Sequence, residues 1–234
     1  MQKIQYKESP SPHVVVENFM SIPAARKCLE EAQWLEPMYE PAKIGDLPEL
    51  DGCETCEIIS NTVELGTRHN DVVYLDGYYN KRREKSIILS QLEVALTNQS
   101  FLGTFKKLPG LFPIIAQTTH METILSSYGM CDFYGWHKDT SNEFPHERVI
   151  TCVVHWNTEP QQYTGGELIL TGKTLEDQLA YTPVHNTAIF FESNKCIHAV
   201  NETQHEGEFK DNRFSINLWM GFATERNFPH HKYR

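Results

Sequence analysis

Three side chains of this chain have the types and the spacing of metal ligands. His137 and Asp139 stand two positions apart in "GWHKDT", and side chains two positions apart on a β-strand point to the same side. Such a tripeptide also occurs in ordinary solvated loops, so the pair alone is weak evidence. His198 follows the apolar run 188–191, where a strand would end, and adds a second imidazole. We therefore expect His137, Asp139 and His198 to bind one divalent metal ion.

A fourth side chain has the chemistry to bind an anion. Arg213 opens the apolar run "RFSINLWM", fifteen residues after His198. A buried arginine is costly unless it is paired, and its planar fork can hold a dicarboxylate through two parallel hydrogen bonds. The alternative is an arginine exposed on an edge strand, or one paired with an Asp or Glu of the same chain.

Two chemistries use such a ligand set. Two histidines and one carboxylate on one face of iron leave positions for a bidentate co-substrate and dioxygen, as in the facial triad of non-haem Fe(II) oxygenases. A zinc hydrolase also uses two histidines and a carboxylate with an open position, but it would leave Arg213 unexplained. A non-catalytic binding module would not need all three ligands. Dependence of activity on iron and an oxo acid would separate the first class from the other two.

The N-terminal half of the chain carries mainly helical patterns. Residues 13–19 predict a short strand, and residues 21–35 predict a helix with Ser21 as its N-cap. Apolar residues at a spacing of four predict an amphipathic helix over residues 81–99. Residues 101–113 are broken by Gly and Pro, which predicts a connector.

From about Thr118 the pattern changes to short β-rich runs. They are "HMETILSSY", "RVITCVVHW", "GELILT", "NTAIFFES" and "RFSINLWMGF". Several short strands in succession predict a β-sandwich or a small barrel. We expect an α+β chain with a mainly β core, in which residues 1–117 form a supporting strand and helix region and residues 118–234 form the core of one structural unit.

Composition excludes some classes of protein. The formal net charge of −10 argues against a general nucleic-acid binder, because phosphate binding needs a basic face. The start of the chain has no apolar signal-peptide core, and no run of 18 apolar residues predicts a membrane span, so we expect a cytoplasmic protein with free thiols. Cys53 and Cys56 form a C-x-x-C, but no second ligand pair follows nearby, which argues against a zinc site.

The C-terminal half resembles the 2-oxoglutarate and Fe(II)-dependent oxygenases, in particular the prolyl 4-hydroxylase-like branch. Five segments match in family order over roughly residues 118–222. They are "YGMCDFYGWHKD", "RVITCVVHWN", "GGELIL", "PVHNTAIFFESNKCIHAV" and "NRFSINLWM". The N-terminal "HVVVENFMSIPAARKCLEEA" also resembles the strand and helix that precede this core. The resemblance implies a double-stranded β-helix (jelly roll) with the N-terminal helices packed on it.

The resemblance also implies the roles of individual residues. Arg213 would form the salt bridge to the distal carboxylate of 2-oxoglutarate, and Tyr128 matches a family tyrosine that lines this pocket. His155 stands where the family often has a tyrosine that hydrogen-bonds the same carboxylate. The alternative for His155 is a histidine satisfied within the core. Lys210 is an alternative to Arg213, because the interval between His198 and Arg213 is longer than the usual spacing.

The implied enzyme is a dioxygenase that uses Fe(II), 2-oxoglutarate and O2, with ascorbate as a stimulant, and releases succinate and CO2. It would hydroxylate a C–H bond of a prolyl residue in a protein or peptide; a free amino acid or another small molecule is the alternative substrate. Tyr134, Trp136 and Trp219 are candidate substrate-binding residues, although aromatics beside strands are more often core. No nucleic-acid or membrane partner is expected. The sequence departs from the family pattern at Cys131 and Asn186, where glycines are usual.

Overall fold

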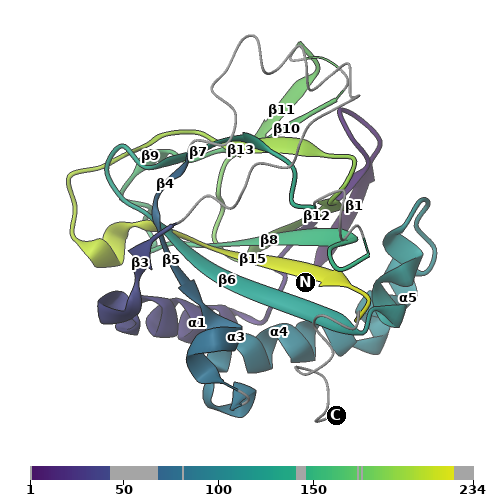
Figure 1. Cartoon of the computed structure of the whole chain (residues 1–234), viewed down its shortest axis with the longest axis horizontal. Coiled ribbons are helices and arrows are strands. Elements are labelled where there is room, and N and C mark those ends of the chain that lie inside the picture. The colour runs from purple at the N-terminus through teal and green to yellow at the C-terminus, as the bar shows by residue number, and fades with distance from the viewer. Residues whose placement is uncertain are drawn as a thin grey trace.

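Two β-sheets face each other, and helices cover the outer side of the larger sheet (Figure 1). The computed structural model describes residues 2–42, 68–80, 82–140, 146–172, 174 and 176–223. Cys53 and Cys56 lie outside these residues, so our prediction for them stays untested. Within the described residues, no helix is both long enough and apolar enough to cross a membrane.

The larger sheet contains eight strands among the described residues, and neighbouring strands run antiparallel. In spatial order they are β1 (Lys3–Lys7), β2 (His13–Glu17), β12 (Thr187–Glu192), β8 (Ile150–Trp156), β15 (Arg213–Gly221), β6 (His120–Tyr128), β5 (Asp71–Tyr74) and β3 (Glu40–Pro41). Strands from the first 74 residues therefore complete the same sheet as strands from the C-terminal half. The boundary that we placed at residue 117 is not marked by a separation of the sheets and stays a prediction.

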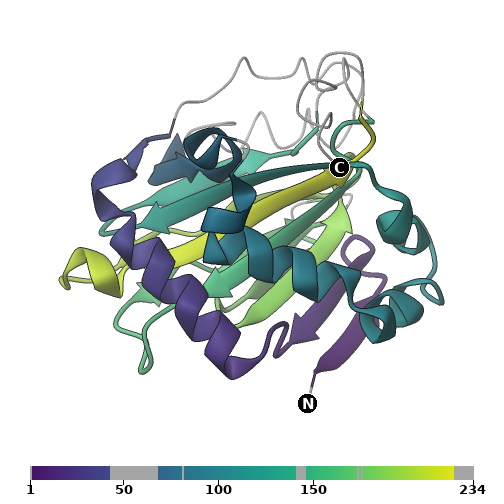
Figure 2. The ribbon, with the colours of Figure 1, turned by 90° about the horizontal axis from the view of Figure 1, so that it is seen from below.

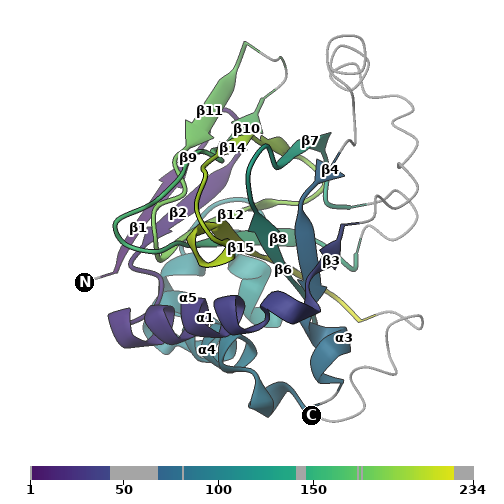
Figure 3. The same cartoon turned by 90° about the vertical axis from the view of Figure 1, so that its left-hand side faces the viewer.

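The smaller sheet lies over the inner face of the larger one (Figure 3). In spatial order its strands are β11 (Gln178–Tyr181), β10 (Leu168–Thr171), β13 (Ile197–Val200), β7 (Phe133–His137) and β4 (Arg68–His69). A short antiparallel pair, β9 (Thr164–Gly165) and β14 (Thr203–Gln204), forms a separate ladder. This arrangement confirms the expected mainly β core of the jelly-roll type.

Alternation along the strands assigns each side chain to a layer. In β15, Phe214, Ile216, Leu218 and Met220 belong to the apolar cluster that also contains the helices. Their neighbours Arg213 and Ser215 face the opposite way, toward the smaller sheet, because successive side chains of a strand point to opposite faces. The inner face therefore combines polar and apolar side chains, and the site described below lies there.

The helices cover the outer face of the larger sheet, as Figure 2 shows. The described helices are α1 (Ile22–Trp34), α3 (Leu75–Tyr79), α4 (Ile87–Thr97) and α5 (Gln99–Phe105), with the 3-10 turns η1 (Glu36–Met38), η2 (Arg83–Lys85), η3 (Phe112–Gln117) and η4 (Phe209–Asp211). Ser21 caps α1 as predicted, since its side chain accepts a hydrogen bond from the amide of Ala24. The predicted second helix is shorter than expected, because α4 begins only after the cap Ser86.

A buried carboxylate joins two of these helices. Glu31 of α1 accepts hydrogen bonds from the hydroxyl of Tyr79 at 2.6 Å, from Ser86 at 2.8 Å and from the amide of Ile88 at 2.7 Å. The last two contacts lie at the N-terminus of α4, where backbone N–H groups have no partner within the helix. Glu31 therefore holds α1 and α4 together at a site where its charge meets three donors.

Helix α5 (Gln99–Phe105) corrects one of our predictions, because residues 101–105 were expected to belong to a connector. Asn98 caps this helix by accepting from the amides of Ser100 and Phe101. Phe101 and Phe105 then lie one turn apart, and both rings contact Phe190 of β12. A helix this short is marginal alone, so its packing on the sheet outweighs the cost of the glycine inside it.

Candidate metal centre and anion pocket

The register of two strands of the smaller sheet brings the three predicted ligands together. His137 is the last residue of β7 and pairs directly with His198 of β13, while Asp139 follows two residues after His137. One ligand atom from each residue lies within 4.8 Å of the other two. The carboxylate oxygens of Asp139 are 3.4 Å from Nε2 of His137 and 3.3 Å from Nε2 of His198. All three side chains converge on one point between the sheets.

The backbone orients both imidazoles with Nε2 toward this point. Nδ1 of His137 lies 2.8 Å from the carbonyl oxygen of Gly135, and Nδ1 of His198 lies 3.3 Å from that of Cys196. A carbonyl can only accept, so Nδ1 carries the proton in each ring and Nε2 keeps a lone pair. Nε2 of His137 is buried and makes no hydrogen bond among the described residues. Two nitrogen lone pairs and a carboxylate in one place form a cluster of acceptors that a divalent cation would satisfy.

The protonation states suit metal binding at neutral pH. Burial, with a further contribution from His198, lowers the pKa of His137 to about 4. Burial works to raise the pKa of Asp139, but the two adjacent histidines hold it well below its usual value. Both residues are therefore deprotonated near pH 7, and neither has to lose a proton before it can coordinate a cation. The donor set fits Fe(II), and by its chemistry alone it would also fit zinc.

Residues of the larger sheet hold the carboxylate in place. The hydroxyl of Thr151, in β8, donates to Oδ2 of Asp139 at 2.7 Å, and the hydroxyl of Ser193 lies 2.8 Å from that of Thr151. Arg148 donates to the backbone carbonyl of Asp139 at 3.1 Å. The sequence analysis did not single out these three residues. Two of them, Arg148 and Thr151, are the first and last residues of the segment "RVIT", which is part of one of the five segments that resemble the family.

Tyr134 and Arg68 extend the site along the strands. The ring of Tyr134 stacks on that of His137 with 3.6 Å between centroids, and the guanidinium carbon of Arg68 lies 4.5 Å from the centre of the tyrosine ring. Strand register explains both contacts. Arg68 of β4 pairs directly with Tyr134 of β7. The pairing of β7 with β13 is irregular between Tyr134 and His137, which lets these two side chains meet. Tyr134 therefore lies against one of the three candidate metal ligands, and its role in substrate binding stays a prediction.

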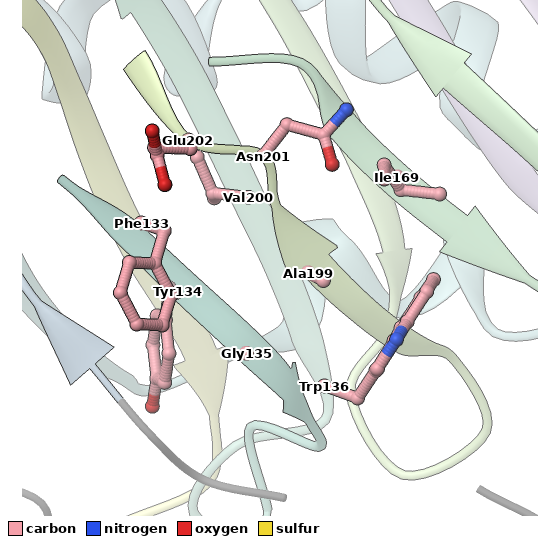
Figure 4. A pocket seen from close by; sticks show the side chains of 9 residues that line it. All are labelled: Phe133, Tyr134, Gly135, Trp136, Ile169, Ala199, Val200, Asn201 and Glu202. Atoms are coloured by element: carbon pink, nitrogen blue, oxygen red, sulfur yellow. The ribbon is translucent and has the colours of Figure 1, made fainter. Parts of the chain in front are cut away.

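The two tryptophans that we predicted to bind substrate lie in different places. Trp219 is buried on the inner face of β15, where the guanidinium of Arg148 lies 3.8 Å from its ring centre. Trp136 instead lines a separate pocket of about 310 Å³ (Figure 4). The residues lining that pocket are Phe133, Tyr134, Gly135, Trp136, Ile169, Ala199, Val200, Asn201 and Glu202. None of the three metal-ligand candidates lines this pocket, and neither does Trp219. The two tryptophans therefore lie in different places, and their substrate-binding roles stay predictions.

Arg213 is fully buried between the two sheets and has no carboxylate partner among the described residues. Its Nε donates to the carbonyl of Gly166 at 2.7 Å, and one terminal nitrogen donates to the hydroxyl of Ser215 at 3.1 Å. Burial lowers its pKa, since the charged form has lost its hydration. A buried cation without a counter-ion is strongly disfavoured, so this site is suited to an anionic ligand.

The side chains of Tyr128 and His155 both contact Arg213. The guanidinium carbon lies 4.6 Å from the ring centre of Tyr128, which pairs with Arg213 across β6 and β15. Nδ1 of His155 lies 3.4 Å from a terminal nitrogen of Arg213, which can only donate, so Nδ1 accepts and Nε2 carries the proton. Burial, followed by the charge of Arg213, holds the pKa of His155 well below its usual value. The histidine is therefore a neutral donor whose Nε2 has no partner among the described residues.

Lys210, the alternative basic residue, lies elsewhere. It belongs to the exposed turn η4 and forms an ion pair with Glu208 at 2.6 Å. Its side chain is exposed, whereas that of Arg213 is inaccessible to solvent. Of these two residues, it is Arg213 that faces the space between the sheets.

Comparison with known proteins identifies this architecture. Residues 123–221 match the family model described as the 2OG-Fe(II) oxygenase superfamily, and this range contains the three ligand candidates and Arg213. The crystal structure of a prolyl-4-hydroxylase from Pseudomonas putida superposes with a TM-score of 0.54 at 16% identity, covering 91% of this chain and 93% of that one. The core has the fold of the 2OG-Fe(II) oxygenases. The resemblance that we inferred from the five sequence segments is confirmed.

Two further proteins define how far the likeness extends. A prolyl hydroxylase from Trichoplax adhaerens, in complex with a peptide fragment of a hypoxia inducible factor, has a TM-score of 0.60 at 15% identity, covering 89% of this chain and 83% of that one. An uncharacterized PKHD-type hydroxylase of Synechocystis sp. is 29% identical over 154 residues, or 60% of this chain and 50% of that protein. The chain thus spans half the length of this curated relative.

Proposed function

We propose that this protein is an Fe(II)- and 2-oxoglutarate-dependent dioxygenase that hydroxylates a C–H bond of a prolyl residue in a protein or peptide. The observation that carries the proposal is the pairing of two features across one interior space. Three candidate metal ligands converge within 4.8 Å, and a fully buried guanidinium with no carboxylate partner among the described residues faces the same interior. A zinc hydrolase would use the first feature and leave the second without a purpose.

Each residue has a role that follows from its surroundings. His137, Asp139 and His198 would hold the iron through two Nε2 atoms and a carboxylate, and the hydrogen bonds of each Nδ1 keep the rings in position. Arg213 would hold the distal carboxylate of 2-oxoglutarate, and His155 would donate its Nε2 proton to the same group. Bound iron and 2-oxoglutarate would supply the oxidation, in which one atom of O2 enters the C–H bond and the other enters succinate as CO2 leaves.

The interior position of the site serves this chemistry. Asp139, His198 and Arg213 are each less than a tenth exposed. Exclusion of water strengthens the attraction between the guanidinium and a carboxylate, because the local dielectric constant falls. Tyr134, stacked on His137, is placed to contact a substrate that approaches the metal.

The prolyl substrate is the finer part of the proposal. It is supported by the resemblance of the sequence to the prolyl 4-hydroxylase-like branch and by the Trichoplax protein, whose structure holds a peptide fragment. A free amino acid would undergo the same chemistry. Incubation with prolyl peptides and, separately, with free proline would distinguish them by which product gains the mass of one oxygen atom.

The first experiment measures assembly of the site without turnover. Protein prepared without oxygen is mixed with Fe(II) and titrated with 2-oxoglutarate while the visible metal-to-ligand charge-transfer band is recorded. We expect a band in the wild type, and an affinity for 2-oxoglutarate weakened roughly 100-fold or more in Arg213→Ala, which leaves a buried anion unpaired. Lys210→Ala is the matched control, because it removes an exposed, ion-paired lysine near the start of the same strand.

A second variant tests the metal assignment. Asp139→Ala should retain its fold and lose turnover, because one of three iron ligands is gone. A fully active Asp139→Ala would show that the metal site lies elsewhere. Absence of the band in folded wild-type protein would refute the oxygenase proposal and leave the zinc hydrolase and the binding module.

A further inference from the structure

Tyr163 carries a buried hydroxyl for which the described part of the chain provides no hydrogen-bond partner. The residue precedes β9, its side chain is buried, and its phenol oxygen makes no hydrogen bond within the described part of the chain. A buried hydroxyl without a hydrogen bond costs free energy on folding, so such groups are rare unless a ligand or water satisfies them. The sequence analysis did not mark Tyr163, because the segment that matched the family begins after it, at Gly165.

The backbone that carries Tyr163 is held directly against Arg213. Three residues after the tyrosine, Gly166 accepts a hydrogen bond from Nε of Arg213 at 2.7 Å. The approach is so close that a Cβ atom on Gly166 would lie 2.6 Å from Cδ of Arg213. Gly166 also has a φ of +70°, which glycine adopts without strain. The turn after Tyr163 is therefore shaped by its contact with the arginine.

The phenol of Tyr163 lies within electrostatic reach of the guanidinium of Arg213. Burial raises the pKa of Tyr163 to about 12, although the positive charge of Arg213 acts to lower it. The hydroxyl is therefore protonated at neutral pH and is available as a donor. Together with Nε2 of His155, it gives two buried donors near one buried cation. Among the residues that the structure describes, neither donor has a hydrogen-bond partner and the cation has no carboxylate partner.

The buried guanidinium of Arg213 indicates which ligand these donors serve. It has no carboxylate partner among the described residues, so an anionic group fits beside it. A carboxylate has room for several donors, and Arg213 supplies only some of them. We propose that the phenol hydroxyl of Tyr163 donates a hydrogen bond to the distal carboxylate of 2-oxoglutarate beside Arg213. This inference rests on the proposed function.

The test separates binding of the distal carboxylate from binding of the oxo acid end. Wild type and Tyr163→Phe are loaded with Fe(II) without oxygen and titrated with 2-oxoglutarate and, separately, with 2-oxopentanoate, which lacks the distal carboxylate. We expect Tyr163→Phe to bind 2-oxoglutarate roughly tenfold or more weakly, and 2-oxopentanoate as the wild type does. Tyr39→Phe is the matched control, since its hydroxyl donates to the carbonyl of Ala32 on the helical side of the molecule.

A second readout does not depend on iron. The shift in melting temperature that 2-oxoglutarate produces in metal-free protein should be smaller for Tyr163→Phe than for wild type, and unchanged for Tyr39→Phe. Equal affinity of wild type and Tyr163→Phe for 2-oxoglutarate would overturn the inference and leave the proposed function standing. Equal weakening for both oxo acids would show a structural role and also overturn it. Absence of any band in the wild type would instead remove the proposed function itself.

Discussion

Replacement of Thr151 by valine should weaken metal binding without disturbing the fold. Valine keeps the shape of the side chain and removes the hydroxyl that donates to Oδ2 of Asp139 at 2.7 Å. That hydroxyl is itself held by Ser193 at 2.8 Å, and both residues are inaccessible to solvent. In the variant, water cannot readily replace the lost donor, so the carboxylate is free to rotate away from the two histidines.

The size of the effect follows from the charge and burial of the carboxylate. A hydrogen bond to a charged group contributes about 1.5–3 kcal/mol, which corresponds to a factor of roughly 10 to 100 in a binding constant. Loss of a residue that orients a metal ligand typically weakens metal binding by a similar factor. We therefore expect the dissociation constant for Fe(II) to rise roughly 10- to 100-fold in Thr151→Val, and to change little in Thr151→Ser, which keeps the hydroxyl.

The measurement is a titration of metal-free protein with Fe(II) without oxygen, in competition with a chelator whose absorbance reports free iron. Thr123→Val provides the matched control, because Thr123 lies buried on β6 and its hydroxyl makes no hydrogen bond within the described residues. If Thr151→Val binds iron within about twofold of the wild type, the hydroxyl does not position the ligand, and the reasoning fails.

Two further substitutions test the packing around the site and the helical layer. Gly166→Ala should lower the free energy of unfolding by about 1–3 kcal/mol and weaken binding of 2-oxoglutarate, because its Cβ would lie 2.6 Å from Cδ of Arg213 at a φ of +70°. Urea unfolding and the charge-transfer titration measure the two effects, and an unchanged affinity would argue against the close contact. Glu31→Ala should cost about 3 kcal/mol of stability, since it leaves three buried donors without an acceptor. A loss below about 1 kcal/mol in urea unfolding would contradict the role of Glu31 as the link between α1 and α4.

Cys131 and Asn186 have left-handed backbone conformations, which glycine adopts most easily. Cys131 and Asn186 occupy positions where the family usually has glycine, and both have positive φ values, 62° and 60°. Asn186 meets this requirement with a side chain that bonds both the amide and the carbonyl of Met20. Both residues therefore adopt a left-handed backbone conformation, which glycine adopts without strain.

The sequence by itself determined the features that depend on near neighbours. The H-x-D spacing placed His137 and Asp139 on one side, alternation marked the strands, and Ser21 marked the start of α1. Each of these depends on interactions within a few residues, which the order of residues specifies directly. The ordered family segments extended this to His198 and Arg213.

Only the tertiary structure decided which distant groups meet. The register of β13 on β7 sets His198 opposite His137, and the pairing of the two sheets brings Thr151 to Asp139. The same packing turns residues 99–105 into a helix and leaves the hydroxyl of Tyr163 buried with no hydrogen-bond partner among the described residues. These contacts join residues far apart along the chain. Their geometry follows from how the layers pack, and no local pattern records it.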